Sequence, residues 1–255
     1  MTRTALVTGG GRGIGRAVAL ALAERGFDVV VSARSRDAIE GVAAEVRALG
    51  RRALAVSSDV TRPEDVSALC QTTRSELGPI AVLVNNAGVA TSAPIKAQSL
   101  EEWNRVLAVN ATGPFLCMQA ALPDMVEQRF GRVVNVASIT ARMGAPYIAA
   151  YTASKHALLG LTRVAAAEYG EKGITVNAVC PGYVDTDMTR DSIARVREKT
   201  GLSEADALGA ILKTAGQKRL VTPDEVAFIV VSLCAEDAAG VNGQAIVIDG
   251  GGLLA

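Results

Sequence analysis

The sequence predicts a single α/β domain whose doubly wound, mostly parallel seven-stranded sheet is covered by helices on both faces. Short runs rich in Val and Ile alternate with longer stretches of helical pattern. Most of these runs are apolar on both faces, which is typical of parallel strands buried between helices. No low-complexity linker or short repeat divides the chain, so residues 1–255 are expected to form one domain. The expected strands span residues 5–8, 29–32, 53–57, 82–85, 133–137, 175–179 and 245–248.

Hydroxyl side chains mark the expected starts of several helices. Thr61, Ser99 and Thr222 each stand three residues before a Glu, which is the pattern of a capping box. Ser203 stands in the same relation to Asp206. The helix that begins there belongs to residues 183–220, a long, charge-rich excursion between the sixth and seventh strands. An excursion at this point of an α/β sheet is either a lid over a site or decoration, and we expect a substrate lid.

Charge and composition exclude several classes of protein. Lys and Arg number 26 and balance 26 Asp and Glu, so the chain lacks the basic surface that nucleic acids and anionic membranes attract. Its four cysteines are widely spaced and its one histidine is His156, which argues against a disulfide framework or a metal site. The first residues lead into a strand without a signal-peptide pattern, so a soluble, cytoplasmic protein is expected.

A glycine-rich turn follows the first expected strand and opens the first expected helix. Glycines let the backbone turn sharply and approach a pyrophosphate, and the helix N-terminus supplies free N–H groups. The spacing is G-x-x-x-G-x-G, and the alternative is an ordinary glycine-rich turn. The context of strand, turn and helix favours a dinucleotide site of the Rossmann type. The residues expected to hold the coenzyme here are Gly9, Gly11, Arg12, Gly13, Ile14 and Gly15.

The end of the second strand bears on the choice of coenzyme. An acidic residue there would bind the free 2′-hydroxyl of NADH, but this sequence reads Ser32-Ala-Arg34. Arg34 and Arg12 offer guanidinium groups that suit a 2′-phosphate. The alternative is two solvated surface arginines. The missing carboxylate and the two cations together favour NADPH over NADH.

Polar and small residues follow the third and fourth strands. Asp59 and Val60 are placed to meet the adenine edge, although Asp59 equally suits a plain turn before a helix. Asn86, Ala87 and Gly88 let the backbone approach a ligand at the carboxyl end of the sheet, where α/β proteins bind.

Tyr151 and Lys155 stand four residues apart at the start of a helical stretch, so they share one helix face. A free phenol has a pKa of about 10, and a nearby ammonium group lowers it. This makes Tyr151 a candidate proton donor to a carbonyl oxygen, with Ser138 as its partner. The alternative is a chance spacing on a helix surface. His156 lies roughly 100° around the helix from Lys155, so packing or an interface is expected for it.

The ordered set of Thr8–Gly15, Asn85–Gly88, Asn110, Ser138, Tyr151-x-x-x-Lys155 and Pro181-Gly182 resembles the short-chain dehydrogenase/reductases over essentially the whole chain. The similarity is greatest to 3-oxoacyl thioester reductases and polyketide ketoreductases. The resemblance implies an NADP(H)-dependent oxidoreductase that assembles as a homotetramer.

The resemblance also implies roles for single residues. Tyr151 would be the catalytic acid and would also contact the coenzyme, Lys155 would lower its pKa and hold the nicotinamide ribose, and Ser138 would orient the carbonyl. Asn110 would hold a water that links Lys155 to solvent. The residues implied to surround the nicotinamide are Pro181, Gly182, Val184 and Thr186.

The function predicted is NADPH-dependent reduction of a ketone, as a 3-oxoacyl thioester or a polyketide-type ketone. One alternative is an NAD(P)-dependent alcohol dehydrogenase of the 3-hydroxyacyl or 3-hydroxybutyrate type. Enzymes of the latter type place a His shortly after the catalytic Ser, whereas Ile139 and Thr140 follow Ser138 here. Another alternative is a non-catalytic NADPH-binding sensor. Four further side chains would line an apolar substrate pocket, or simply pack within loops: Met143, Tyr147, Tyr183 and Met188.

Overall fold

The computed structural model describes residues 3–253, apart from the side chain of Thr214. Its seven strands form one sheet in the order β3-β2-β1-β4-β5-β6-β7, and every neighbouring pair is parallel. The strands are β1 (Thr4–Thr8), β2 (Asp28–Ala33), β3 (Ala53–Ser57), β4 (Ile80–Asn85), β5 (Gly131–Val136), β6 (Ile174–Pro181) and β7 (Ala245–Ile248). The predicted fold and all seven strands are confirmed, and the differences lie at strand ends.

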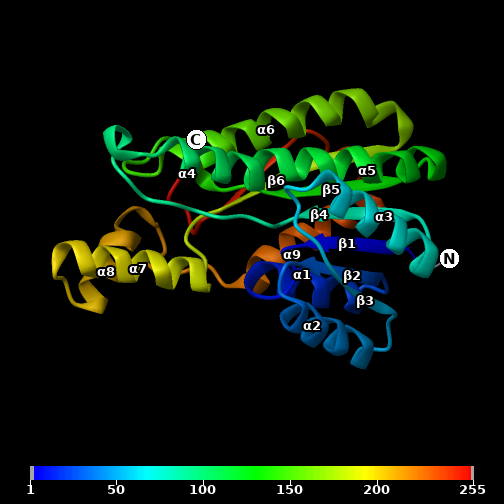
Figure 1. Cartoon of the computed structure of the whole chain (residues 1–255), viewed down its shortest axis with the longest axis horizontal. Coiled ribbons are helices and arrows are strands. Elements are labelled where there is room, and N and C mark those ends of the chain that lie inside the picture. The colour runs from blue at the N-terminus through cyan, green and yellow to red at the C-terminus, as the bar shows by residue number, and fades with distance from the viewer. Residues whose placement is uncertain (1–2, 254–255) are drawn as a thin grey trace.

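Nine α-helices accompany the sheet in this part of the chain: α1 (Gly13–Glu24), α2 (Arg36–Ala48), α3 (Pro63–Leu77), α4 (Leu100–Leu107), α5 (Gly113–Gln128), α6 (Ala149–Tyr169), α7 (Asp187–Thr200), α8 (Glu204–Ile211) and α9 (Pro223–Cys234). Helices α1, α2 and α9 cover one face, and α3, α5 and α6 cover the other (Figure 1). Side chains alternate between the two faces, because Ala5 and Val7 join the first core and Leu6 joins the second.

The order of the strands reverses next to β1, because β2 lies on one side of it and β4 on the other. A crevice opens at the carboxyl ends of strands where the order reverses, and α/β proteins bind ligands there. The hydroxyl of Thr8, the last residue of β1, accepts hydrogen bonds from the backbone N–H groups of Asn86 (3.1 Å) and Ala87 (3.2 Å). These bonds hold the ends of β1 and β4 together at the crevice.

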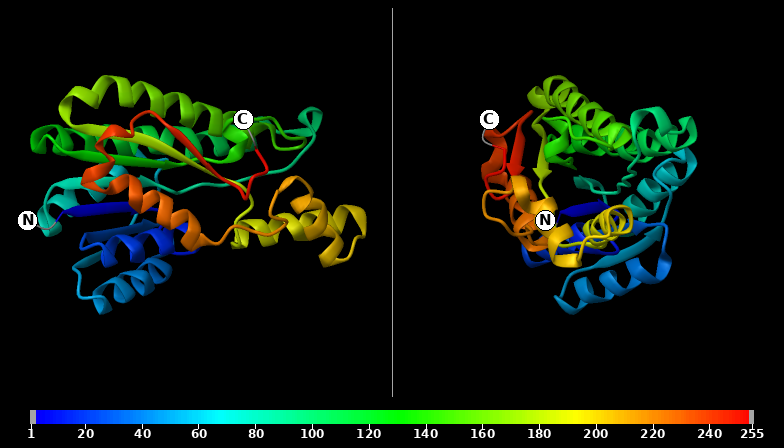
Figure 2. Two further views of the ribbon diagram at one scale, coloured as in Figure 1. Left: turned by 180° about the vertical axis from the view of Figure 1, so that it is seen from behind. Right: turned by 90° about the vertical axis from the view of Figure 1, so that its left-hand side faces the viewer.

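Residues 183–220 leave the sheet at this same edge. Helices α7 and α8 project beyond the carboxyl ends of the strands (Figures 1 and 2), as a lid would. Backbone hydrogen bonds between Tyr183 and Val221 and between Asp185 and Val221, each 2.9 Å, join the base of the excursion.

Three of the four predicted helix starts are confirmed. Ser99, Ser203 and Thr222 each accept a hydrogen bond from the backbone N–H three residues later, and Thr222 forms a complete capping box. The prediction for Thr61 is wrong. Its N–H and its hydroxyl both donate to the carboxylate of Asp59, at 2.9 and 2.8 Å, and α3 begins at Pro63. These two bonds close a local turn at Asp59, so the Thr61 hydroxyl is already bonded and does not cap the helix.

The helical stretch Leu100–Gln128 is, within the described residues, the one long and apolar enough to cross a membrane by length and composition alone. This is weak evidence, because a buried core helix meets the same criterion. Within this stretch Cys117, Met118 and Ala121 of α5 belong to the core beneath the sheet.

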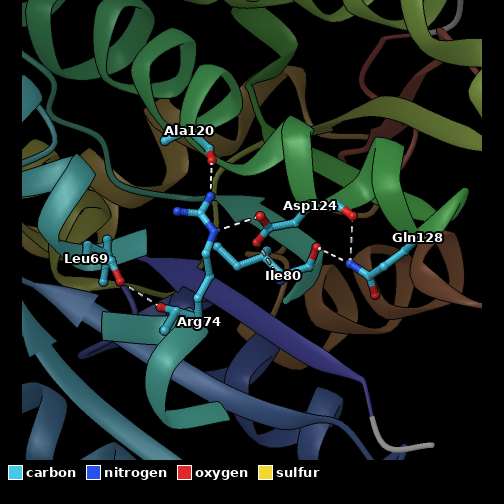
Figure 3. A network of polar contacts seen from close by, with 7 residues as sticks. Leu69, Arg74, Ile80, Ala120, Asp124 and Gln128 are labelled. Atoms are coloured by element: carbon cyan, nitrogen blue, oxygen red, sulfur yellow. Dashed lines mark hydrogen bonds and ion pairs between the residues drawn. The ribbon is translucent and has the colours of Figure 1, made fainter. Parts of the chain in front are cut away.

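A polar network fixes where β4 begins (Figure 3). The buried Asp124 of α5 accepts a hydrogen bond from Nε of Arg74 at 2.7 Å and another from the backbone N–H of Ile80 at 2.9 Å. Arg74 also donates to the carbonyl of Ala120, and Gln128 donates to that of Ile80. One carboxylate therefore joins the end of α3, the start of β4 and α5.

We predict that Asp124→Ala lowers the free energy of unfolding by about 2–3 kcal/mol, because it leaves the N–H of Ile80 and the guanidinium of Arg74 without their acceptor. Urea denaturation measures this loss. Glu102→Gln is the control, because its partner Arg105 and the pair itself are exposed; it should cause a much smaller change. Equal losses in the two variants would contradict the role assigned to Asp124.

Candidate active site

A cleft of about 840 Å³ opens at the carboxyl edge of the sheet, between the glycine loop, the start of α6 and the first residues of α7. Every residue predicted from the sequence to bind coenzyme or to act in catalysis lines this cleft, except Gly15 and Asn110. Those two are buried. The structure thus brings together residues that lie far apart in the sequence.

The glycine loop has the geometry that phosphate binding requires. Gly9 has φ +63°, a conformation that side chains rarely adopt, and a Cβ atom on Gly15 would collide with the carbonyl of Gly9 and the amide of Asn86. That amide donates to the carbonyls of Thr8 (3.1 Å) and Gly9 (2.9 Å), which ties the loop to the end of β4. Helix α1 has neither a side-chain cap nor an acidic residue in its first turn. No side chain of this first turn therefore competes with a bound anion for the N-terminal N–H groups.

The adenosine end of the cleft carries the predicted cations and an unused hydroxyl. Arg12, Arg34 and Asp59 all line it, and Oγ of Ser58 is buried without a hydrogen-bond partner in the described structure. Burial opposes ionisation of Asp59, but hydrogen bonds from Thr61 and the positive charge of Arg34 lower its pKa. Asp59 therefore forms the predicted helix-approach turn and lines the cleft as well.

One of the two predicted arginines forms an ion pair within the cleft. Arg12 is turned toward α7, where its Nη1 atom lies 3.1 Å from Oδ2 of Asp187. Asp187 in turn lies 2.9 Å from Nη1 of Arg190, and both line the cleft. Sequence reasoning missed Asp187 and Arg190, because nothing in their local pattern distinguishes them from other charged residues of a surface helix.

Tyr151, Lys155 and Ser138 meet at the other end of the cleft. Tyr151 and Lys155 lie on the first two turns of α6, and Ser138 follows β5. The ammonium of Lys155 is buried, lies 5.6 Å from the centre of the Tyr151 ring and donates to the carbonyl of Val136 at 2.8 Å.

Burial dominates the electrostatics of this pair. Burial lowers the pKa of Lys155 from 10.5 to about 8, and it raises the pKa of Tyr151, with the neighbouring Ser138 hydroxyl acting in the opposite direction. The sequence-based expectation was a phenol whose pKa is lowered by Lys155. In this structure burial dominates instead: it raises the pKa of the Tyr151 phenol, and no effect of Lys155 on that phenol is resolved.

Asn110 holds the catalytic helix in place from behind. It lies in a π-helical turn, Ala108–Thr112, where its Oδ1 accepts from the N–H of Val89 at 2.9 Å. Its Nδ2 donates to the carbonyl of Val89 at 2.8 Å and to Oγ of Ser154 at 3.0 Å. Ser154 donates in turn to the backbone carbonyl of Tyr151 at 2.7 Å. Both N–H groups of the amide are therefore already donated. A water bound to Asn110 would have to donate its own hydrogen to an oxygen atom of Asn110.

Sequence reasoning also missed Ser154. The only available signal was its position three residues after Tyr151, which places it on the same side of α6. The other residues singled out from the sequence take minor positions. His156 is exposed and contacts the carbonyl of Thr152, and of the four residues proposed for an apolar pocket only Met188 lines the cleft. The four cysteines are free and buried.

The fold and the cleft together define a dinucleotide-binding α/β oxidoreductase. The family model described as short chain dehydrogenase matches residues 3–197, and the chain belongs to this family. The resemblance inferred from the sequence is thereby confirmed.

Relatives match along nearly their full length. The chain is 38% identical to the 3-oxoacyl-(acyl-carrier-protein) reductase FabG of Staphylococcus epidermidis, over 98% of this chain and 99% of that one. It is 35% identical to the D-beta-hydroxybutyrate dehydrogenase of Rhizobium meliloti, over 98% of each. Among solved structures, a variant of actinorhodin polyketide ketoreductase with NADPH superposes with a TM-score of 0.94 at 35% identity, covering 98% of this chain and 97% of that one.

The buried ammonium yields a stability prediction. At pH 7 both the folded and unfolded states carry the Lys155 proton, so the folded state bears the full cost of burying the charge. Lys155→Met removes that cost, and we expect a higher free energy of unfolding at pH 7.

The difference should shrink as the pH rises. Between the folded pKa of about 8 and the unfolded value of 10.5, the unfolded wild type binds more protons, so its stability increases with pH. Denaturation at pH 7 and pH 9.5 tests this, with the exposed Lys96→Met as a control. A stability difference for Lys155→Met that is the same at both pH values would contradict burial as its cause.

Proposed function

We propose that this chain is an NADPH-dependent reductase of ketones, acting in the cytoplasm as a homotetramer. One observation carries the proposal. A single cleft holds the glycine loop, Arg12 and Arg34 at one end and Ser138, Tyr151 and Lys155 at the other. Reduction of a ketone needs a coenzyme that delivers hydride to the carbonyl carbon and a proton donor beside the carbonyl oxygen. The cleft has room for the coenzyme and holds a proton donor.

The cleft residues fit the coenzyme. The loop around Gly9 leaves room for a pyrophosphate at the N-terminus of α1, and Arg34 and Arg12 suit a 2′-phosphate. The unpartnered hydroxyl of Ser58 offers a further polar contact near the adenosine end. The backbone of Asn86–Gly88 would lie along the coenzyme, while Pro181, Gly182, Val184 and Thr186 would surround the nicotinamide. NADPH, when bound, supplies the hydride.

The chain's own residues supply the proton. Tyr151 donates its phenolic proton to the carbonyl oxygen, and Ser138 donates a hydrogen bond to the same oxygen. Because burial raises the pKa of Tyr151, the phenol is protonated before the reaction. Lys155 stabilises the phenolate formed by this transfer and holds the ribose hydroxyls. Proton return from solvent would pass along Lys155 and a water held by an oxygen of Asn110.

The proposed substrates are 3-oxoacyl thioesters or polyketide-type ketones. The names of the relatives support this class, since one is a 3-oxoacyl-(acyl-carrier-protein) reductase and one solved structure is a polyketide ketoreductase. In Figures 1 and 2, α7 and α8 project beyond the carboxyl ends of the strands, and we propose that they form a lid over the substrate.

A second candidate is an alcohol dehydrogenase that works in the oxidative direction, and the 35% identity to a D-beta-hydroxybutyrate dehydrogenase favours it. The same residues serve both directions, because acid and base exchange roles on reversal. A preference for NADPH supports the reductase, and a preference for NAD⁺ supports the dehydrogenase. A non-catalytic NADPH sensor would have no use for Ser138, Tyr151 and Lys155 in one cleft.

We predict that Tyr151→Phe lowers NADPH oxidation with acetoacetyl thioester by about a hundredfold to ten-thousandfold, because the ring still packs but has no proton to transfer. The affinity for NADPH should stay within about twofold of wild type, since the loop and the arginines are unchanged. Absorbance of NADPH during turnover and calorimetric titration measure the two quantities.

Tyr169→Phe, at the far end of the same helix, is the matched control and should keep wild-type activity. Unchanged turnover in Tyr151→Phe would overturn the mechanism. Faster turnover with NADH than with NADPH in the wild type would overturn the coenzyme assignment.

A further inference from the structure

Four charged side chains that line the cleft form a continuous series of ion pairs. It runs from Arg12 in the glycine loop to Asp187 at the first position of α7, then to Arg190 and back to Asp185. The closest N···O distances are 3.1, 2.9 and 2.9 Å in that order. All four side chains line the cleft. These ion pairs connect the glycine loop before α1 to the first turn of α7.

Arg12 has a second use that competes with this position. Under the proposed function, Arg12 joins Arg34 in binding the 2′-phosphate of NADPH, yet in the structure it is directed to Asp187. The pair is exposed, with 79% of the Arg12 side chain and 51% of the Asp187 side chain accessible. An exposed ion pair contributes little stability, so Arg12 can leave Asp187 at small cost. Asp187 keeps Arg190 as a partner when this happens.

We propose that Asp187 is a specificity-determining residue for the coenzyme, because it competes with the 2′-phosphate for the guanidinium of Arg12. The inference rests on the proposed NADPH dependence. NADH has no 2′-phosphate, so NADH binding leaves the Arg12–Asp187 ion pair intact. Removal of the Asp187 charge therefore gives NADH no gain in affinity. Binding of NADPH draws Arg12 away from the first turn of α7, which couples the choice of coenzyme to the attachment of the lid.

The test compares two fragments of the coenzymes, 2′,5′-ADP and 5′-AMP, by calorimetric titration at low ionic strength. Asp187→Asn keeps the shape of the side chain and removes its charge. It should tighten 2′,5′-ADP binding about two- to fivefold, the range that an exposed ion pair contributes, and leave 5′-AMP binding unchanged. In steady-state assays kcat/KM should rise by a similar factor for NADPH and stay constant for NADH.

Asp185→Asn is the matched control. Asp185 precedes the same helix and forms its ion pair with Arg190, not with Arg12. The ratio of the two fragment affinities should therefore equal that of the wild type. An Asp185→Asn effect as large as that of Asp187→Asn would show a general charge effect and overturn the proposal.

A double variant tests whether Arg12 mediates the effect. In an Arg12→Ala background, Asp187→Asn should no longer change 2′,5′-ADP binding. A persisting change would mean that the carboxylate acts on the phosphate through space, and weaker binding in Asp187→Asn alone would mean that Asp187 positions Arg12 for the phosphate. Either result overturns the proposal.

Fragment binding by the wild-type protein distinguishes a failure of this proposal from a failure of the proposed function on which it rests. A wild type that prefers 2′,5′-ADP to 5′-AMP, combined with an Asp187→Asn variant that does not differ from it, overturns only the role of Asp187. A wild type that binds both fragments equally overturns the NADPH preference and the competition together.

Discussion

The side chain of Asn110 joins the three segments on which the cleft depends. Its amide contacts Val89 in the loop after β4 and Ser154 on α6, and Ser154 contacts the backbone of Tyr151. The π-helical turn at Ala108–Thr112 places the amide between these segments. π-helical turns occur frequently at functional sites, and here the turn fixes the distance between the cleft wall and the helix that carries Tyr151 and Lys155. Without this turn, the amide would not reach both the loop after β4 and the helix that carries Tyr151 and Lys155.

The active site and the scaffold treat buried charge in opposite ways. Asp124 is buried with an arginine and a backbone N–H directed at it, so its charge is compensated. Lys155 is buried with one backbone carbonyl as its hydrogen-bond acceptor, and its pKa falls accordingly. The first arrangement holds elements together, whereas the second lowers stability and keeps an ammonium ready beside a phenol. Sites that break the rules of a stable core are where function is expected.

The sequence predicted the strands and the cleft well, because both follow from local patterns. Buried parallel strands are apolar on both faces, and a glycine turn between strand and helix has few other uses. Thr61 was predicted wrongly because Asp59 takes up its hydroxyl, a competition between neighbours that the capping pattern does not reveal. Ser154 was missed because its partner Asn110 lies 44 residues away, and Asp187 was missed because Arg12 lies 175 residues away. Pairings at such separations exist only once the sheet has brought their segments together.

The most direct test of this account is the single-turnover rate of NADPH oxidation in Ser154→Ala. Ser154 has no proposed contact with substrate or coenzyme, so the variant tests the link between Asn110 and the catalytic helix alone. We expect the rate to fall on the order of tenfold or more, because the loss shifts Tyr151 from its working position, while NADPH affinity is unchanged. Ser75→Ala removes a similar bond to a carbonyl three residues earlier on α3 and should leave the rate unaltered. A wild-type rate in Ser154→Ala would contradict the claim that this network positions the site.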